Sequence, residues 1–562
     1  MNLTPNEKLA GVLAPLFALR TETDLGIGDV AALREFIIWS RALGFRLVQL
    51  LPINETGGDN SPYNAISSRA LDPTTIHLAP GSPIDLSDAA INEVLLAVDL
   101  PALRRGPVHY DIVKSIKKKL LERAFASFQT KSPNDNFNAF CSAEQSWLES
   151  YTLFRVLMEQ NGERETWDEW PQSSINAAHQ WLHSLGKDER ERFEERRQFF
   201  RYVQWVAYEQ WREVKRFAAE HDVALMGDIP FGVSYYSADV FAHPESFALD
   251  WSGGAPPEPY FKDDEFTQKW GQNWGIPLYH WSEMRTNNFA WWRQRVRGVK
   301  EIFHIFRIDH VLGFYRIYAF PWRPSRNVEI LPLTWEEMLA RTGGRFPHFT
   351  PRDDQSWENC EQNRREGEEY LRVVLEEAGA TCVVGEDLGT VPNYVRPNLH
   401  SLGIAGFKIP QWETFPDQQP VPGSAYERLS VATFATHDHK PLRALWEDAF
   451  ERKTESSAQA RHDLEQIARF ANVPLPNEYK SYAHDFYPVI FEVLFRSDSW
   501  LAIVMITDLL GRKDRFNVPG TATDSNWSRR LHTTVRKLGG GHALREQLRL
   551  VRDLLQRSGR TL

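Results

Sequence analysis

Short apolar runs of strand length recur along this 562-residue chain, and most of them end in a polar residue. Eight runs follow this pattern, at residues 45–53, 74–78, 223–230, 302–309, 381–386, 404–409, 429–438 and 500–508. Near-continuous apolar strands that alternate with helical patterns are typical of parallel strands buried on both faces of a sheet. The runs therefore predict an α/β fold, and their number favours a (β/α)8 TIM barrel.

The uneven spacing between the runs predicts large insertions between the barrel strands. A long stretch with a charged helical pattern separates the runs at 74–78 and 223–230. Long irregular connections in compact folds usually form lids or binding loops. We expect one domain over residues 1–562 with insertions that form lid subdomains: a largely helical one at 80–220, a Trp-, Gly- and Pro-rich substrate lid at 240–300 and a further one at 321–370.

Charge, cysteine content and apolar stretches restrict the partners and the compartment. The formal net charge of −10 leaves no basic excess to neutralise phosphates, so no nucleic-acid partner is expected. Three dispersed cysteines without a CxxC pattern fit a reducing compartment. The stretches 9–19 and 500–510 contain Pro15 and Asp508, match neither a signal peptide nor a membrane span, and are interpreted as buried strand or loop. A cytoplasmic protein that does not bind membranes is expected.

Polar residues at the ends of the apolar runs are the first candidates for a site, because barrel active sites form at the C-terminal ends of the strands. A single carboxylate after a strand is more often a helix N-cap or a surface residue. Four ends of this kind, two of which combine an acid with an arginine or a histidine, favour a shared site. They are GDIP with Asp228, FRIDH with Arg307 and Asp309, GED with Glu386, and ATHD with His437 and Asp438.

Cleavage of a glycosidic bond is one reaction that needs such a set of carboxylates. Its oxocarbenium-like transition state requires one ionised carboxylate and a second carboxyl group that is kept protonated. Arg307 precedes Asp309 by two residues, so both side chains point to the same face of a strand and the cation favours an ionised Asp309. Glu386 follows a wholly apolar stretch and has no adjacent basic residue, which suits the protonated partner.

Aromatic residues give a second indication of a sugar ligand, because the flat C–H faces of sugar rings pack on indole. Most of the 20 tryptophans are interpreted as core residues of the insertions. Trp274, within the polar and Gly-rich GQNWG, is instead predicted to contact substrate.

Motifs for cofactors and metals are weak or missing. The GxGxxA match at 26–31 follows a polar segment, so it fails the strand context of a dinucleotide site. The sequence has no GxxxxGK[ST], HExxH or GxSxG motif. We therefore expect neither a cofactor nor a metal.

Nearly the whole chain resembles the 4-α-glucanotransferases (amylomaltase or disproportionating enzyme) of glycoside hydrolase family 77. The motifs that carry the resemblance are GVLAPLFALRTETDLGIGD, SPYNAISSRALDP, SADVFAHPESF, GAPPEPYF, GQNWGIPLYHW, FRIDH, GEDLG, THD, RFNVPGT and Asn526-Trp527. The resemblance implies a (β/α)8 barrel with insertions and without the C-terminal β-domain of related amylases.

The resemblance also implies roles for individual residues. Asp309 corresponds to the nucleophile, Glu386 to the general acid/base and Asp438 to the stabiliser of the transition state. The residues around the sugar at the cleaved bond correspond to Tyr63, Asp228, Arg307 and His437. The implied donors are maltooligosaccharides and starch- or glycogen-type glucans, and the implied acceptor is glucose or another glucan.

The chain departs from the family pattern beside two of the acids. RIDH is followed by Val-Leu-Gly-Phe at 311–314, where the family usually has Phe-Arg-Gly-Phe, so Leu312 replaces a cation. THD is followed by His439, Lys440 and Pro441, where the family usually has Asn and then Asp-Thr. The departures leave acceptor choice and preferred glucan length open.

Three functions are compatible with this sequence. The leading hypothesis is transfer of an α-1,4-glucan segment through a covalent glycosyl-Asp309, with Glu386 as acid and then base. A plain α-glucan hydrolase uses the same intermediate, and a glucan-binding protein without activity can keep the fold. Lids that exclude water favour transfer over hydrolysis.

Overall fold

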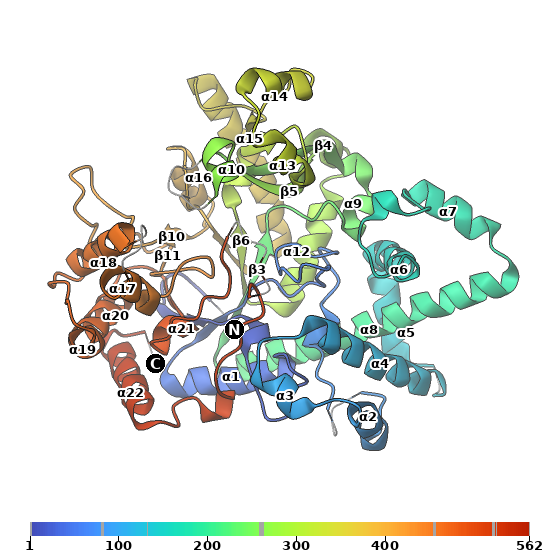
Figure 1. Cartoon of the computed structure of the whole chain (residues 1–562), viewed down its shortest axis with the longest axis horizontal. Coiled ribbons are helices and arrows are strands. Elements are labelled where there is room, and N and C mark those ends of the chain that lie inside the picture. Colours follow the sequence, from blue (N-terminus) through green and yellow to red (C-terminus); the bar gives the residue numbers. More distant parts are fainter. Residues whose placement is uncertain are drawn as a thin grey trace.

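A closed barrel of eight parallel strands forms the centre of the molecule (Figure 1). The computed structural model describes residues 3–79, 84–131, 133–257, 264–452, 457–519, 523 and 525–560. In spatial order the strands are β10 (Gly406–Lys408), β11 (Ser430–Ala432), β12 (Leu501–Met505), β1 (Leu9–Leu13), β2 (Leu47–Gln49), β3 (Ala224–Pro230), β6 (Ile305–Asp309) and β9 (Cys382–Gly385). A parallel bridge between Val384 and Ala405 joins the outer strands of this order. The predicted (β/α)8 barrel is confirmed.

Seven of the eight apolar runs contain a barrel strand, and the prediction of a strand at 74–78 is wrong. A 3-10 turn begins there at Pro73, because the Asp72 carboxylate accepts a hydrogen bond of 2.8 Å from the Thr74 N–H. The buried ammonium group of Lys117 donates to the carbonyls of Thr74 and Ile76, which ties this segment to a helix and not to the sheet. The eighth strand is β1, within the stretch 9–19 that the sequence assigned to strand or loop.

Helices follow the strands and cover the outside of the barrel (Figure 1). They are α1 (Val30–Leu43), α8 (Lys187–Glu220), α12 (Ala290–Ile302), α15 (Trp357–Ala378), α16 (Val395–Ser401), α17 (Leu442–Phe450), α20 (Tyr487–Arg496) and α22 (His542–Arg557). Further helices in the connections are α9 (Ala238–Ala242), α10 (Glu265–Lys269), α11 (Trp281–Thr286), α13 (Asn327–Ile330), α14 (Trp335–Arg341), α18 (Ser457–Phe470), α19 (Tyr479–Ser481) and α21 (Ile506–Leu509). Within the described ranges, no helix is both long and apolar enough to cross a membrane.

The connection between β2 and β3 is mainly helical and projects to one side of the barrel (Figure 1). It contains α2 (Asp88–Leu95), α3 (Leu100–Arg105), α4 (Tyr110–Gln129), α5 (Asp135–Ala143), α6 (Gln145–Gln160) and α7 (Ile175–Ser184). The chain returns to the barrel through α8, whose first turns are exposed and charged. The start of the insertion predicted at 80–220 lies outside the described residues, as do residues 258–261 of GAPPEPYF and 520–521 of RFNVPGT.

A second, antiparallel sheet is built from the connections after β3 and β6. Its strand order is β5 (Gln272–Tyr279), β4 (Phe247–Ala255), β7 (Ile317–Phe320) and β8 (His348–Thr350). It has a small hydrophobic core of its own: Trp270, Phe320, Trp322, Ile330 and Met338. Because these connections leave the C-terminal ends of β3 and β6, the sheet stands on the side of the barrel where an active site is expected.

Asp508 lies in α21 beyond the end of β12, not at the strand end. Its side chain is 3% exposed and accepts a hydrogen bond of 2.6 Å from the Leu442 N–H at the start of α17. Burial raises the pKa of Asp508 to about 7, against the smaller opposite effect of the Leu442 N–H. The group is therefore protonated in the folded protein at mildly acidic pH.

Asp508→Asn is expected to reduce the loss of stability that accompanies a rise in pH from 5 to 8. The folded-state pKa lies above that of the unfolded chain, so the contribution of Asp508 is complete below its unfolded pKa and disappears as pH rises through about 7. Between pH 5 and pH 8, the free energy of unfolding of the variant should improve relative to the parent by roughly 1–3 kcal/mol. Urea titrations at both pH values measure this, and a constant difference would contradict ionisation of buried Asp508.

Candidate active site

Arg307 is the centre of a buried ion-pair network at the ends of β3 and β6. Its Nη1 donates to Oδ2 of Asp228 at 2.6 Å, and its Nη2 lies 2.6 Å from Oδ1 of Asp309. The first contact arises because Asp228 and Arg307 are paired across the two strands. The second arises because side chains two residues apart on a strand share a face. The Asp309 side chain is 29% exposed, so this acid is open to a ligand while Arg307 is buried.

Tyr63 joins this network from the loop after β2. Its hydroxyl donates to Oδ2 of Asp228 at 2.7 Å and lies 3.2 Å from Nδ1 of His437. The Tyr63 and His437 rings are stacked at 4.6 Å, and Trp527 flanks both. Burial, reinforced by the Asp228 charge, raises the pKa of Tyr63 well above its usual value. Tyr63 is therefore a neutral donor.

Asp438 is held in the ionised state by its neighbours. Oδ2 lies 3.1 Å from Nε2 of His437, and Oδ1 accepts a hydrogen bond of 2.6 Å from Nδ2 of Asn517. Burial opposes ionisation, but His437 and Asn517 outweigh it and lower the pKa of Asp438. Arg515 donates to the Asp438 carbonyl and fixes its backbone. The Asp438 side chain is 40% exposed and faces outward from this support.

Glu386 has the opposite electrostatic character. Burial and the nearby negative charge of Asp309 raise the pKa of Glu386 to about 8. Oε2 accepts a hydrogen bond of 2.9 Å from the His310 N–H, and Oε1 accepts one of 3.0 Å from the Leu388 N–H. These two contacts orient the carboxyl group. Near neutral pH the site therefore combines a protonated Glu386 with an ionised Asp438.

Trp274 reaches this site from β5 of the antiparallel sheet. The side chain is 39% exposed, and its ring meets that of His310 at 4.7 Å in an edge-to-face arrangement. His310 follows Asp309 directly and has a left-handed backbone with φ of 52°. The structure thus brings all eight predicted site residues to one end of the barrel, seven through the carboxylate network and Trp274 through His310.

The two departures from the family pattern have local structural consequences. Leu312 is 4% exposed and is part of the main hydrophobic core. Nδ1 of His439 lies 2.9 Å from the Thr436 N–H and accepts its hydrogen bond, and the His439 ring lies 4.9 Å from that of Trp412. Burial lowers the pKa of His439 to about 4. His439 is therefore neutral and adds no charge beside Asp438.

Three residues that the sequence analysis left without a role support the acids. His310 gives its backbone N–H to Glu386, and Arg515 and Asn517 hold Asp438. Arg515 and Asn517 belong to RFNVPGT, a motif that indicated the family but not these contacts. Among the described residues, no group of three or more His, Cys, Asp or Glu side chains is arranged to hold a metal ion.

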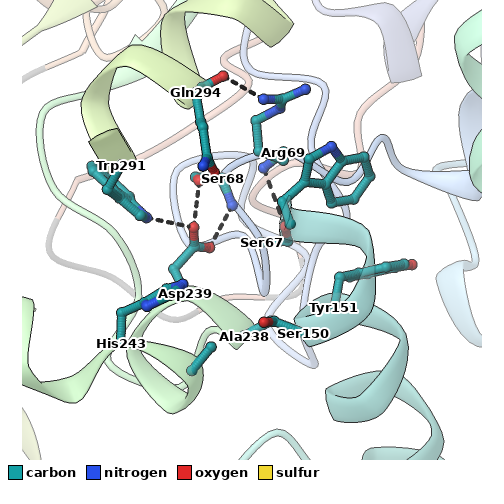
Figure 2. Close-up of a pocket in the computed structure, with 12 residues that line it drawn as sticks. Ser67, Ser68, Arg69, Ser150, Tyr151, Ala238, Asp239, His243, Trp291 and Gln294 are labelled. Carbon is teal, nitrogen blue, oxygen red and sulfur yellow. Dashed lines mark hydrogen bonds between the residues drawn. The ribbon is translucent and has the colours of Figure 1, made fainter. Parts of the chain in front are cut away.

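A small cavity lies where the loop after β2 meets α6, α9 and α12 (Figure 2). Asp239 of α9 accepts hydrogen bonds from the N–H and hydroxyl of Ser68 and from Nε1 of Trp291, at 2.7, 2.5 and 2.9 Å. The cavity has a volume of about 30 Å³, which suits a water molecule and excludes a sugar. We interpret it as part of the scaffold that holds the loop after β2 against α9 and α12.

The structure combines a closed (β/α)8 barrel with three acidic groups at its strand ends: a carboxylate held by an arginine, a protonated carboxyl group and an ionised carboxylate. These are the features of an enzyme that acts on glycosidic bonds. Sequence comparison specifies the family. Residues 14–535 match glycoside hydrolase family 77, 4-alpha-glucanotransferase. The chain therefore belongs to the 4-alpha-glucanotransferase family and is a glycosyltransferase-type enzyme that acts on glucans.

Individual relatives agree with this assignment. A 4-alpha-glucanotransferase from Chlamydia pneumoniae is 31% identical over 94% of this chain and 92% of its own length. One from Aquifex aeolicus is 27% identical over 93% of this chain and 95% of its own length. Amylomaltase structures from Streptococcus agalactiae, in complex with acarbose, and Corynebacterium glutamicum share the fold with TM-scores of 0.74 and 0.75. Their identities are 20% and 21%, and the matches cover 99% and 97% of this chain and 100% and 75% of theirs.

Proposed function

We propose that this enzyme moves α-1,4-glucan segments from a donor maltooligosaccharide, starch or glycogen-type glucan to the 4-hydroxyl of glucose or another glucan. The transfer retains the anomeric configuration and passes through a covalent glycosyl-Asp309. The observation that carries the proposal is the contrast between Asp309, held by Arg307 at 2.6 Å, and Glu386, whose pKa is raised to about 8. A retaining glycosidic reaction needs this pairing of nucleophile and acid.

In the first step, Asp309 attacks the anomeric carbon and the bond to the leaving glycosidic oxygen breaks. Glu386 gives its proton to that oxygen, so the leaving glucan departs with a free 4-hydroxyl. In the second step, the ionised Glu386 takes the proton of an incoming 4-hydroxyl, whose oxygen attacks the same carbon and releases Asp309. Proton and charge are restored after each cycle.

In this proposal, the other predicted residues stabilise the transition state or hold the sugar at the cleaved bond. Asp438 supplies negative charge to the oxocarbenium-like transition state, because His437 and Asn517 keep it ionised. Tyr63, Asp228, Arg307 and His437 line the subsite of the cleaved bond, and Trp274 packs on a sugar face.

We propose that the insertions at 80–220, 240–300 and 321–370 act as lids over this site. The antiparallel sheet β5–β4–β7–β8 supports this role, because it brings Trp274 to within 4.7 Å of the His310 ring beside Asp309. Exclusion of water from the glycosyl-enzyme favours a sugar acceptor over hydrolysis.

Incubation with maltotriose tests the proposed activity. Transfer should produce a ladder of longer and shorter maltooligosaccharides together with glucose, while the number of reducing ends stays constant. Chromatography of the products and a reducing-end assay on the same sample measure both quantities. A rise in reducing ends without longer products would indicate a hydrolase, and binding without turnover of any donor–acceptor pair would indicate a binding protein.

A further inference from the structure

A row of aromatic side chains runs from the start of α14 to strands β8 and β4 of the antiparallel sheet, apart from the predicted catalytic residues. The row, here called the lid aromatic strip, consists of Trp335, Phe346, His348 and Trp251. Consecutive ring centroids are 5.7, 5.3 and 5.2 Å apart. Trp335 is 47% exposed and Phe346 is 43% exposed. Large apolar side chains grouped on a surface usually mark a binding site.

One end of the strip packs on the second hydrophobic core. Trp335 stacks at 6.0 Å and 20° on Trp270, which is 5% exposed and belongs to the second hydrophobic core. The stack covers one side of the Trp335 ring, and the exposed part faces outward. At the other end, the His348 ring meets that of Trp251 edge-on at 86°. Rings fixed in this way lose little conformational entropy when a ligand binds.

We propose that the lid aromatic strip binds a segment of an α-glucan polymer outside the active site. This proposal rests on the proposed function, because it takes the same glucan as ligand. Sugar rings present apolar C–H faces to aromatic rings, and the Trp335 and Phe346 planes are inclined by 52°. An α-1,4-linked chain curves, so its successive sugars present faces at an angle to one another, which two inclined rings can match.

The border of the strip is polar, as a sugar ligand requires. Arg345 forms an ion pair of 2.7 Å with Asp250, and its guanidinium lies 5.7 Å from the Trp251 ring. Both charged side chains are well exposed, at 45% and 64%. Together with His348 they offer donors and acceptors to sugar hydroxyls.

The size and place of the strip favour a glucan over a protein partner. A stable protein interface buries about 800 Å² on each partner, whereas this strip is one row of four rings with charged groups beside it. The same sheet carries Trp274 on β5, next to His310. A polymer bound to the strip would therefore be held by the element that approaches the predicted catalytic residues.

Affinity electrophoresis in gels containing glycogen tests this site with the full chain. The double variant Trp335→Ala/Phe346→Ala should bind glycogen about tenfold more weakly, which corresponds to about 1.4 kcal/mol. Its transfer from maltotriose should remain within about twofold of the parent, because the active site alone can hold this short donor and its contacts at the reacting centre are unchanged. Trp357→Ala is the matched control: Trp357 is also the first residue of a helix and is 74% exposed, and its loss should leave glycogen binding unchanged.

The single variants Phe346→Ala and Trp335→Ala, each with its melting temperature, show whether the lid still folds if the double variant does not. Unchanged glycogen retention in the folded variants would overturn the proposal. A change in oligomeric mass on sedimentation, with unchanged retention, would also overturn it and identify the strip as a contact between copies of this chain. Failure of the proposed function appears separately, as absence of maltotriose transfer by the parent protein.

Discussion

Asp309→Asn should lower kcat for glucan transfer by about 10⁴-fold or more, the range found when a covalent nucleophile is removed from an enzyme. The amide oxygen of asparagine carries no negative charge and cannot form the glycosyl ester. The amide still fits the space beside Arg307, whose second partner Asp228 remains at 2.6 Å. Glucan binding should therefore stay close to that of the parent. Single-turnover rates with maltotriose and calorimetric binding measure the two quantities.

The control for this variant is a carboxylate at the same end of the barrel but outside the network. Asp417 is exposed in the connection between β10 and β11, where it accepts a hydrogen bond of 3.1 Å from the Gln419 N–H. Asp417→Asn should transfer glucan at the parental rate. If Asp309→Asn kept near-parental activity, the nucleophile would lie elsewhere in the chain.

The barrel was predictable because burial on both faces imposes the same composition on every strand. Two segments, residues 74–78 and β1, show where composition alone does not predict a barrel strand. Residues 74–78 have the β-branched composition of a strand, but Ile76 and Leu78 are buried outside the sheet, and the ammonium group of Lys117 donates to two carbonyls of the segment. The sequence of the stretch 9–19 fits either a strand or a loop, because the neighbours of β1 in the sheet, β2 and β12, cannot be inferred from a local pattern.

The predictability of the site depended on the distance in sequence between the interacting residues. The contact between Arg307 and Asp309 follows from two-residue spacing on one strand. The hydrogen bond from Tyr63 to Asp228 spans 165 residues, and only the family resemblance placed both at one subsite. The N–H of His310 that orients Glu386 belongs to the backbone, so no residue type indicates it.

Glu386→Gln should lower transfer from maltotriose by about 10²–10⁴-fold, the usual contribution of general acid–base catalysis. The pH profile gives a sharper test than the rate. The pKa of Glu386 is about 8, so the acid form predominates below this pH and is lost above it. The first step of transfer in the parent should therefore decline as pH rises through about 8, and this alkaline limb should be missing in the Gln variant.

A donor that needs no acid assistance separates the two chemical steps in Glu386→Gln. The fluoride ion of α-glucosyl fluoride leaves without needing a proton, so Asp309 should still attack the anomeric carbon of this donor and form the glycosyl-enzyme. No base then remains to activate the acceptor, and the adduct should accumulate at Asp309, where intact-mass and peptide mass spectrometry can locate it. Asp309→Asn should form no adduct under the same conditions. The opposite pattern, with an adduct in Asp309→Asn and none in Glu386→Gln, would reverse the two roles, because the residue that forms the ester must be the one whose loss prevents labelling.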